Sequence, residues 1–239
     1  MNRAAAKAYN STRAKEGRLL KDAIVQDLPF SGSLTAQAPE WRVRERSMLR
    51  LLKHFARSGS ELRVLEIGCG NGWLSARVTE AGHVVTAMDI HSEELDQARR
   101  VFTGSGIDWQ LGDPMEHVFP AGSFDRIVFA ASLQYFADVP LLFAHIRPWL
   151  SLKGEVHVVD SVLYPDRQAA MLAQERSVAY FAKLGTPEMA RFYHHHTKDE
   201  IMQCGSSLVL SSPSHWDWSH FPPRRLHDPF HHTVHTFRS

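Results

Sequence analysis

The sequence is poor in cysteine, in long apolar runs and in net charge, and each shortage excludes a class of protein. Its two cysteines, Cys69 and Cys204, are too few for a disulfide framework and lack metal-site spacing. No run of about 18 apolar residues is present, so we expect no transmembrane helix. The 27 Lys and Arg nearly balance the 26 Asp and Glu, which argues against nucleic-acid binding through bulk charge. These shortages predict a reducing compartment, with the cytoplasm as the default location.

The N-terminal segment also lacks the apolar run of a secretory signal. Residues 1–21 hold six Lys or Arg and a single acid, Glu16. This composition is typical both of a mitochondrial transit peptide and of a basic helix that packs on the domain. The apolar residues of 19–24 stand at helical spacing, which indicates a packed helix, and residues 29–40 form a loop rich in Pro, Gly and Ser.

Histidine, by contrast, is abundant. Nine of the 15 histidines follow residue 193, and His194, His195 and His196 are consecutive. Because imidazole titrates near pH 6.5, a nearly neutral chain of this kind could gain positive charge in mild acid.

Strand and helix patterns alternate through the middle of the chain. Apolar residues at helical spacing predict helices at 41–57, 73–81, 92–102 and 138–150. Short apolar runs rich in β-branched residues predict buried strands at 62–67, 83–89, 107–111, 124–130 and 155–160. Ser92 is a candidate N-cap for the third helix. The alternation predicts βαβ units, a parallel sheet and helices on both faces.

The end of the chain departs from this alternation. Thr197 and Glu200 have the spacing of a capping box, so a helix is expected to begin there. Residues 207–211 and 232–237 read as two further strands with no crossover helix between them. Their Pro-rich connection predicts an antiparallel strand pair joined by a long loop.

A glycine-rich loop follows the first predicted strand. Gly68, Gly70 and Gly72 would let a ligand approach the backbone closely at a helix N-terminus. Trp73 stands where a dinucleotide fingerprint has its third glycine, and Glu66 would repel a phosphate but attract a cation. Asp89 ends the second strand and can accept hydrogen bonds from ribose hydroxyls. Together these residues indicate a nucleoside that carries positive charge and no phosphate.

The stretch VLEIGCGNGWLS at 64–75 resembles the first motif of class I S-adenosylmethionine-dependent methyltransferases, and the later motifs follow in order over residues 41–160. The resemblance implies a Rossmann-like α/β fold with a seven-stranded, mostly parallel sheet whose last strand is antiparallel. It implies S-adenosylmethionine as cofactor, with Glu66 near its amino group, Asp89 on the ribose and Asp113 near the adenine. The cofactor-binding residues expected by resemblance are Glu66, Gly68, Cys69, Gly70, Asn71, Gly72, Asp89, Ile90, Asp113, Pro114, Met115, Ala130 and Ala131.

The chain is interpreted as one methyltransferase domain over 1–239. Its parts are an N-terminal helix and loop (1–40), a cofactor-binding core (41–160), a substrate lid (161–196) and a C-terminal helix and strand pair (197–239). The lid leaves the carboxyl end of the fifth strand, above the expected site. Its aromatic and histidine residues are expected at the rim: Tyr164, Tyr180, Phe192, Tyr193 and His194–His196.

The expected reaction is in-line transfer of a methyl group to a small-molecule acceptor. A general base is needed where the acceptor must lose a proton, and the candidates are His194, His195, His196 and Tyr135. Asp160 either ends its strand or faces the substrate. The acceptor atom and the oligomeric state are not readable from the sequence.

Several alternatives remain at this point. The [D/N/S]-P-P-[Y/F/W] motif of amino-group methylation in nucleic acid is absent after the fourth strand, where Ala131–Gln134 stand. An RNA or protein acceptor, a non-catalytic cofactor-binding protein and an NAD-dependent dehydrogenase are the competing functions. No metal site is expected, because three consecutive histidines cannot all face one ion on a regular helix or strand.

Overall fold

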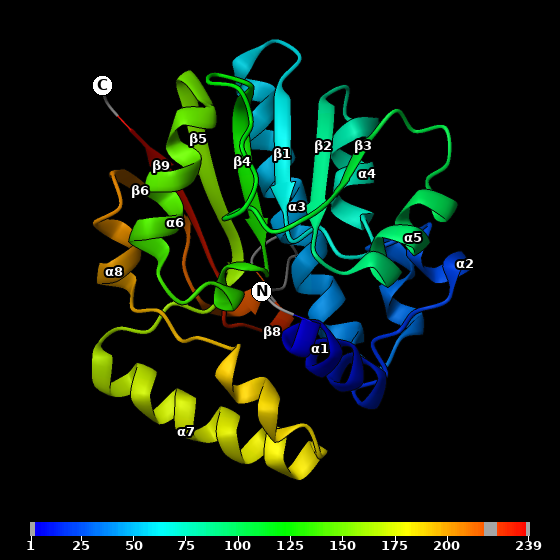
Figure 1. The fold of residues 1–239 in the computed structure, drawn as a ribbon, viewed down its shortest axis with the longest axis vertical. Helices are drawn as coiled ribbons and strands as arrows, with labels where there is room; N and C mark the ends of the chain where they lie inside the picture. The colour runs from blue at the N-terminus through cyan, green and yellow to red at the C-terminus, as the bar shows by residue number, and fades with distance from the viewer. Residues whose placement is uncertain (1–2, 218–223, 238–239) are drawn as a thin grey trace.

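A seven-stranded sheet forms the centre of the molecule, in the computed structural model that describes residues 3–217 and 224–237 (Figure 1). The strand order is β3-β2-β1-β4-β5-β9-β6. The strands are β1 (Arg63–Ile67), β2 (Val84–Asp89), β3 (Asp108–Leu111), β4 (Phe124–Ala130), β5 (Leu150–Ser161), β6 (Ser206–Ser211) and β9 (His231–Thr236). Neighbouring strands from β3 to β5 are parallel, and β9 is antiparallel to both β5 and β6. The predicted Rossmann-like class and the antiparallel last strand are confirmed.

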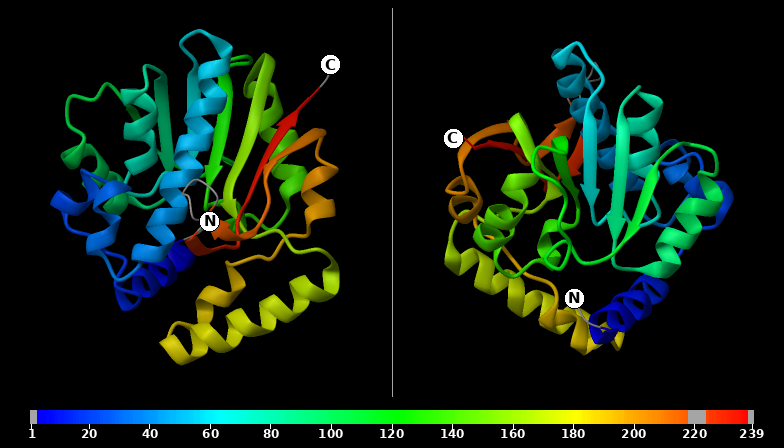
Figure 2. Two further views of the ribbon diagram at one scale, coloured as in Figure 1. Left: turned by 180° about the vertical axis from the view of Figure 1, so that it is seen from behind. Right: turned by 45° about the horizontal axis from the view of Figure 1, so that its top comes forward.

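Helices cover both faces of this sheet (Figure 2). The helices are α1 (Arg3–Lys15), α2 (Asp22–Val25), α3 (Ala38–Phe55), α4 (Trp73–Glu80), α5 (Ser92–Val101), α6 (Val139–Ile146), α7 (Arg167–Leu184) and α8 (Lys198–Met202). Short 3-10 turns lie at Phe30–Leu34 (η1), Ala56–Ser58 (η2), Leu133–Tyr135 (η3), Arg147–Trp149 (η4) and Pro187–Arg191 (η5). The Thr197 capping box that starts α8 is present as predicted.

Successive side chains of a strand point to opposite faces of the sheet, so the buried apolar residues form two clusters, one on each face. Val64 and Val128 pack with α3, α4 and α5 on one face. Leu65, Ile127 and Phe129 pack with α6 on the other face. Because both faces are covered, the central strands β1, β2 and β4 are largely apolar, which is why they were visible as apolar runs.

Several local expectations were wrong. The apolar residues of 19–24 do not form one packed helix, because residues 16–21 separate α1 from α2 and Leu19 is exposed. Residues 29–40 are not all loop, since they hold η1 and the start of α3. Ser92 is the first residue of α5 and His91 occupies the N-cap position. The helix predicted over 138–150 ends at Ile146 and continues as η4, which holds Pro148. Strand β5 starts five residues early, at Leu150. The expected long loop contains a two-stranded hairpin, β7 (Ser214–Asp217) with β8 (Arg224–Asp228).

Two helical segments lie beneath the carboxyl ends of the parallel strands (Figure 1). One is α1 and the other is α7 with η5. They touch each other, since Lys15 Nζ donates to the Gly185 carbonyl at 2.6 Å and the Tyr180 hydroxyl donates to Glu16 at 2.6 Å. Within the described ranges, no helix has the length and apolar character needed to cross a bilayer.

Candidate active site at the carboxyl edge of the sheet

The glycine loop adopts backbone that only glycine takes without strain. Gly68, Gly70 and Gly72 have φ angles of 77°, 54° and 75°. A Cβ on Gly68 would lie 2.4 Å from the Ser132 Cβ, and one on Gly70 would lie 2.5 Å from a Glu94 carboxyl oxygen. The loop is therefore packed closely against the ends of β4 and α5.

Asp89 joins the end of β2 to this loop. One of its carboxyl oxygens accepts the Gly70 N–H at 2.7 Å and the other accepts the His91 N–H at 2.9 Å. Burial raises the pKa of Asp89, while these N–H donors oppose the shift. Each carboxyl oxygen keeps a further acceptor position, so the group can still take hydroxyl donors.

Glu66 lies buried on the opposite side of the loop. Its carboxyl group accepts a short hydrogen bond of 2.5 Å from the Ser75 hydroxyl. Burial raises the pKa of Glu66 to about 8, and the nearby Asp89 adds to the rise. A carboxyl group in this environment is stabilised as a carboxylate when a cation approaches it.

Two adjoining cavities open along this edge. The first, here called the glycine-loop cavity, has a volume of about 280 Å³, and the second, the Asp89 cavity, has about 460 Å³. The glycine-loop cavity is lined by the predicted residues Glu66, Gly68, Cys69, Gly70, Asn71, Ala130 and Ala131. The Asp89 cavity is lined by the predicted residues Gly68, Asp89, Ile90, Asp113, Pro114, Met115 and Ala131. The cofactor-binding residues predicted from the sequence, except Gly72, therefore lie together at one edge of the sheet.

Gly72 differs from the other predicted cofactor residues because it lines neither cavity. It is the N-cap of α4, and a Cβ there would lie 2.4 Å from the Trp109 ring. Its role in the structure is to let α5 and β3 pack behind the loop.

Five residues line both cavities and so mark where they meet: Tyr9, Gly68, Ala131, Tyr135 and His194. Tyr9 contacts Tyr135 edge to face, with ring centres 5.6 Å apart. Two residues at the strand ends adopt left-handed backbone. Ala131, directly after β4, has a φ of 53°, and Asp160, the last residue but one of β5, has a φ of 54°. Asp160 lines the glycine-loop cavity, and its buried Oδ1 lacks a hydrogen-bond partner. This geometry favours the substrate-facing reading of Asp160.

The three consecutive histidines have different surroundings. His194 reaches the junction of the cavities. His195 has both ring nitrogens within hydrogen-bond distance of hydroxyl groups, those of Ser177 at 2.9 Å and Tyr164 at 3.1 Å. His196 is buried, and its Nε2 lacks a partner. Burial lowers the pKa of all three, to about 4 for His195, so these rings are neutral near pH 7.

Burial also sets the protonation state of the other candidate groups. Tyr135 is a neutral phenol, because burial raises its pKa. Cys69 is a buried thiol whose pKa is raised well above the usual range, so it is a poor nucleophile. Of the predicted rim residues, Tyr180 lies away from both cavities and instead tethers α1 through Glu16.

The N-terminal helix contributes residues that sequence reasoning missed. Tyr9, Thr12 and Arg13 of α1, and Glu16 directly after it, line the glycine-loop cavity, together with Trp41 and Arg44 of α3. The spacing of 9, 12, 13 and 16 places these four on one face of a helix, a mixed aromatic and polar stripe that could have signalled a buried surface.

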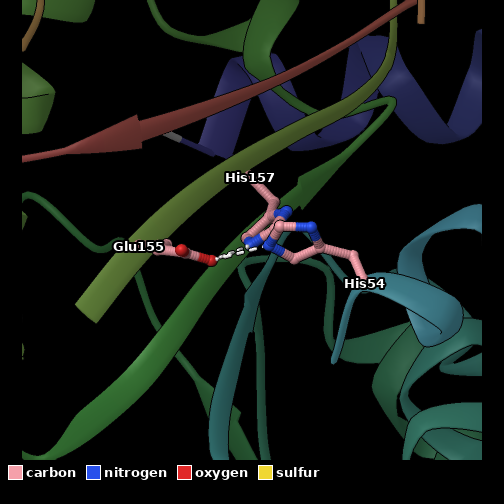
Figure 3. A group of neighbouring side chains, drawn as sticks. All are labelled: His54, Glu155 and His157. Carbon is pink, nitrogen blue, oxygen red and sulfur yellow. Dashed lines mark hydrogen bonds and ion pairs between the residues drawn. The ribbon is translucent and has the colours of Figure 1, made fainter. Parts of the chain in front are cut away.

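A separate cluster, His54, Glu155 and His157, contains three potential metal ligands (Figure 3). Both histidine Nε2 atoms contact Glu155 Oε2, at 3.0 and 3.2 Å, but Arg126 Nε lies 3.1 Å from the same oxygen. A divalent ion on that oxygen would lie within about 5 Å of the guanidinium, and at an effective dielectric of about 20 the repulsion would be roughly 7 kcal/mol. We therefore interpret the cluster as a hydrogen-bonded link between α3 and β5.

Comparison with known proteins identifies the core. Residues 65–158 match the family model described as a methyltransferase domain. The malonyl-[acyl-carrier protein] O-methyltransferase of Erwinia pyrifoliae is 38% identical over 108 residues, which are 45% of this chain and 40% of that protein. The 2-phytyl-1,4-naphtoquinone methyltransferase of Synechococcus elongatus is 29% identical over 105 residues, 41% of this chain and 45% of that one. The chain spans less than half the length of both relatives.

Solved structures agree on the fold. The YcgJ protein of Bacillus subtilis matches with a TM-score of 0.59 at 17% identity, over 70% of this chain and 71% of that one. The S-adenosylmethionine-dependent methyltransferase SibL matches with a TM-score of 0.59 at 18% identity, over 99% of this chain and 70% of that one. The buried carboxyl groups of Glu66 and Asp89 beside a glycine loop fit the cofactor of this family. Residues 65–158 are thus similar to the methyltransferase domain family, and the chain shares the fold of a solved S-adenosylmethionine-dependent methyltransferase.

Proposed function

We propose that the protein transfers a methyl group from S-adenosylmethionine to a small-molecule acceptor. The observation that carries the proposal is the junction of the two cavities at Tyr9, Gly68, Ala131, Tyr135 and His194. The Asp89 cavity holds the residues assigned to the nucleoside, and the glycine-loop cavity continues past the junction under the lid. Together the volumes of about 280 and 460 Å³ lie in the range of small-molecule sites.

The cofactor, when bound, supplies a methyl group made electrophilic by its sulfonium. The chain supplies binding and orientation, and holding two reactants in line can contribute about 7–11 kcal/mol to lowering a barrier. Aromatic rings border the junction: Tyr135 contacts both Tyr9 and Tyr193 edge to face.

His194 is proposed as the group that takes a proton from an acceptor that must lose one. Its ring lies at the junction and burial lowers its pKa, so the basic, neutral form is present near pH 7. His195 and His196 are proposed to shape the cavity, because hydroxyl groups occupy both ring nitrogens of His195 and His196 is buried. Tyr135 is proposed to do the same, because burial raises its pKa and keeps its phenol protonated.

The test uses methyl-labelled S-adenosylmethionine and a metabolite extract. Wild-type protein is expected to transfer label to a low-molecular-weight product, and D89A is expected to abolish transfer because the ribose acceptor is lost. D96N is the matched control, since Asp96 is an exposed acid of α5 that lines neither cavity. H194Q is expected to lower kcat about 100-fold with little change in KM, within the usual range for a general base. A wild type that binds cofactor but labels nothing would contradict the proposal.

The similarity to a malonyl-[acyl-carrier protein] methyltransferase favours one second candidate, an acyl group attached to a carrier protein. The same labelling separates the two. Label in the acid-precipitated protein fraction would indicate a macromolecular acceptor, and label in the soluble fraction would indicate the small molecule proposed here.

A further inference from the structure

The helix α1 forms one wall of the proposed cofactor site and is attached to it at two points. The Tyr9 ring stacks on the His91 ring, with ring centres 4.0 Å apart. His91 lies two residues after Asp89. The Arg13 Nε lies 3.4 Å from Glu94 Oε1. The other Glu94 oxygen sits against Gly70, so α1 reaches the glycine loop through Glu94.

Three polar atoms on this wall are buried without a hydrogen-bond partner. They are Thr12 Oγ1, Arg13 Nε and Glu94 Oε2, and all three residues line the glycine-loop cavity. Arg13 Nε forms no hydrogen bond but faces Glu94 Oε1 in an ion pair at 3.4 Å. Thr12 is only 4% exposed. Buried polar atoms without partners cost free energy, so a set of them around one cavity indicates a polar ligand.

The charges on the wall match an amino acid in its zwitterionic form. Thr12 and Arg13 offer hydrogen-bond donors, which suit a carboxylate. Glu66 and Glu94 offer carboxyl groups, which suit an ammonium. All three arginines of the cavity face a carboxylate, but Arg18 and Arg44 bind Glu40 closely, at 2.7 Å, whereas Arg13 lies 3.4 Å from Glu94.

We infer that Thr12 and Arg13 of the N-terminal helix bind the carboxylate at the amino-acid end of the cofactor, so that the cofactor site is incomplete without α1. This inference rests on the proposed function, since it places the cofactor in the glycine-loop cavity. It adds two residues outside the segment that resembles the family motifs.

Two ligands separate this role from a merely structural one. S-adenosylhomocysteine carries the amino-acid end, and 5′-methylthioadenosine lacks it. Calorimetric titration of R13Q is expected to show S-adenosylhomocysteine binding weakened about tenfold or more, because a charge-assisted hydrogen bond is lost. T12V is expected to weaken it by about threefold to tenfold. Both variants are expected to bind 5′-methylthioadenosine within twofold of wild type.

The control is K15Q, which removes a contact between the same helix and the Gly185 carbonyl but no cavity residue. It is expected to bind both ligands as wild type does. Equal weakening of the two ligands by R13Q, or no weakening of either, would overturn the inference while leaving the cofactor site in place. Wild-type protein that binds neither ligand would contradict the proposed function, and the inference with it.

Discussion

Burial sets the charge of single residues at the candidate site. Glu66, with its pKa raised to about 8, is largely protonated at pH 7 in the free protein. Cofactor binding requires the carboxylate, because the ammonium expected near Glu66 is attracted to the ionised form. The binding of this cofactor should therefore be linked to the release of a proton.

The affinity for S-adenosylhomocysteine is accordingly expected to rise by up to about tenfold for each pH unit between 6 and 8, and to level off above 8. Titration calorimetry in buffers of different ionisation enthalpy measures the released proton directly. E66Q should bind more weakly and lose most of this pH dependence. An affinity that is flat from pH 6 to 8 in the wild type would show that Glu66 is already ionised.

At the level of elements, the conformation of the glycine loop depends on α5 and β3, which pack behind it. G72A combines left-handed backbone, at a φ of 75°, with a Cβ placed 2.4 Å from Trp109. G122A is the matched control, with a φ of 72° and open space around the added Cβ. We expect G122A to lower the unfolding free energy by about 1 kcal/mol and G72A by about 1–3 kcal/mol more. Urea denaturation of both variants tests this, and equal losses would refute the packing role.

The elements differ in how far the sequence specified them. The parallel core was predictable because its strands are continuous apolar runs and its loop carries specific residues in order. The start of β5 was missed because Lys153-Gly154 looks like a break, whereas the strand passes through Gly154, where a Cβ would lie 2.8 Å from that of Leu150. The β7–β8 hairpin was hidden by its prolines.

The site was predictable only in part. The residues of Glu66–Gly70, Asp89 and Asp113 follow the family motif, so local sequence was enough. Thr12 and Arg13 reach the same cavity from far along the chain, and only the tertiary fold brings α1 there. The sequence alone also could not tell which of His194, His195 and His196 is the best candidate for the general base, because that depends on the contacts of each ring in the fold.

The whole molecule carries an unusual set of buried, neutral histidines. Burial lowers the pKa of His157 to about 4, of His232 to about 2 and of His235 to about 4. Below pH 6.5 the unfolded chain binds protons at these positions and the folded chain does not, so stability falls as the pH falls. His157 alone is expected to remove about 3 kcal/mol between pH 6.5 and 4.

Chemical unfolding between pH 7 and 4.5 measures this loss. The wild type is expected to lose stability steadily across the range. H157Q should be less stable at pH 7, since it disturbs the Glu155 contact, but should show a shallower pH slope. H117Q, in a loop at the sheet edge, serves as the control and should keep the wild-type slope. A pH slope of H157Q equal to that of the wild type would contradict the neutral state of His157.

The junction of the two cavities has a consequence for inhibitor design. Under the proposed function, one molecule that joins an adenosyl group to an acceptor fragment through a short linker would fill both cavities past Gly68 and Ala131. Such a bisubstrate ligand loses its translational freedom once instead of twice, so the affinities of its halves reinforce each other. The adenosyl half would anchor the ligand in the Asp89 cavity. The acceptor half, in contact with Tyr193 and His194, would decide its selectivity.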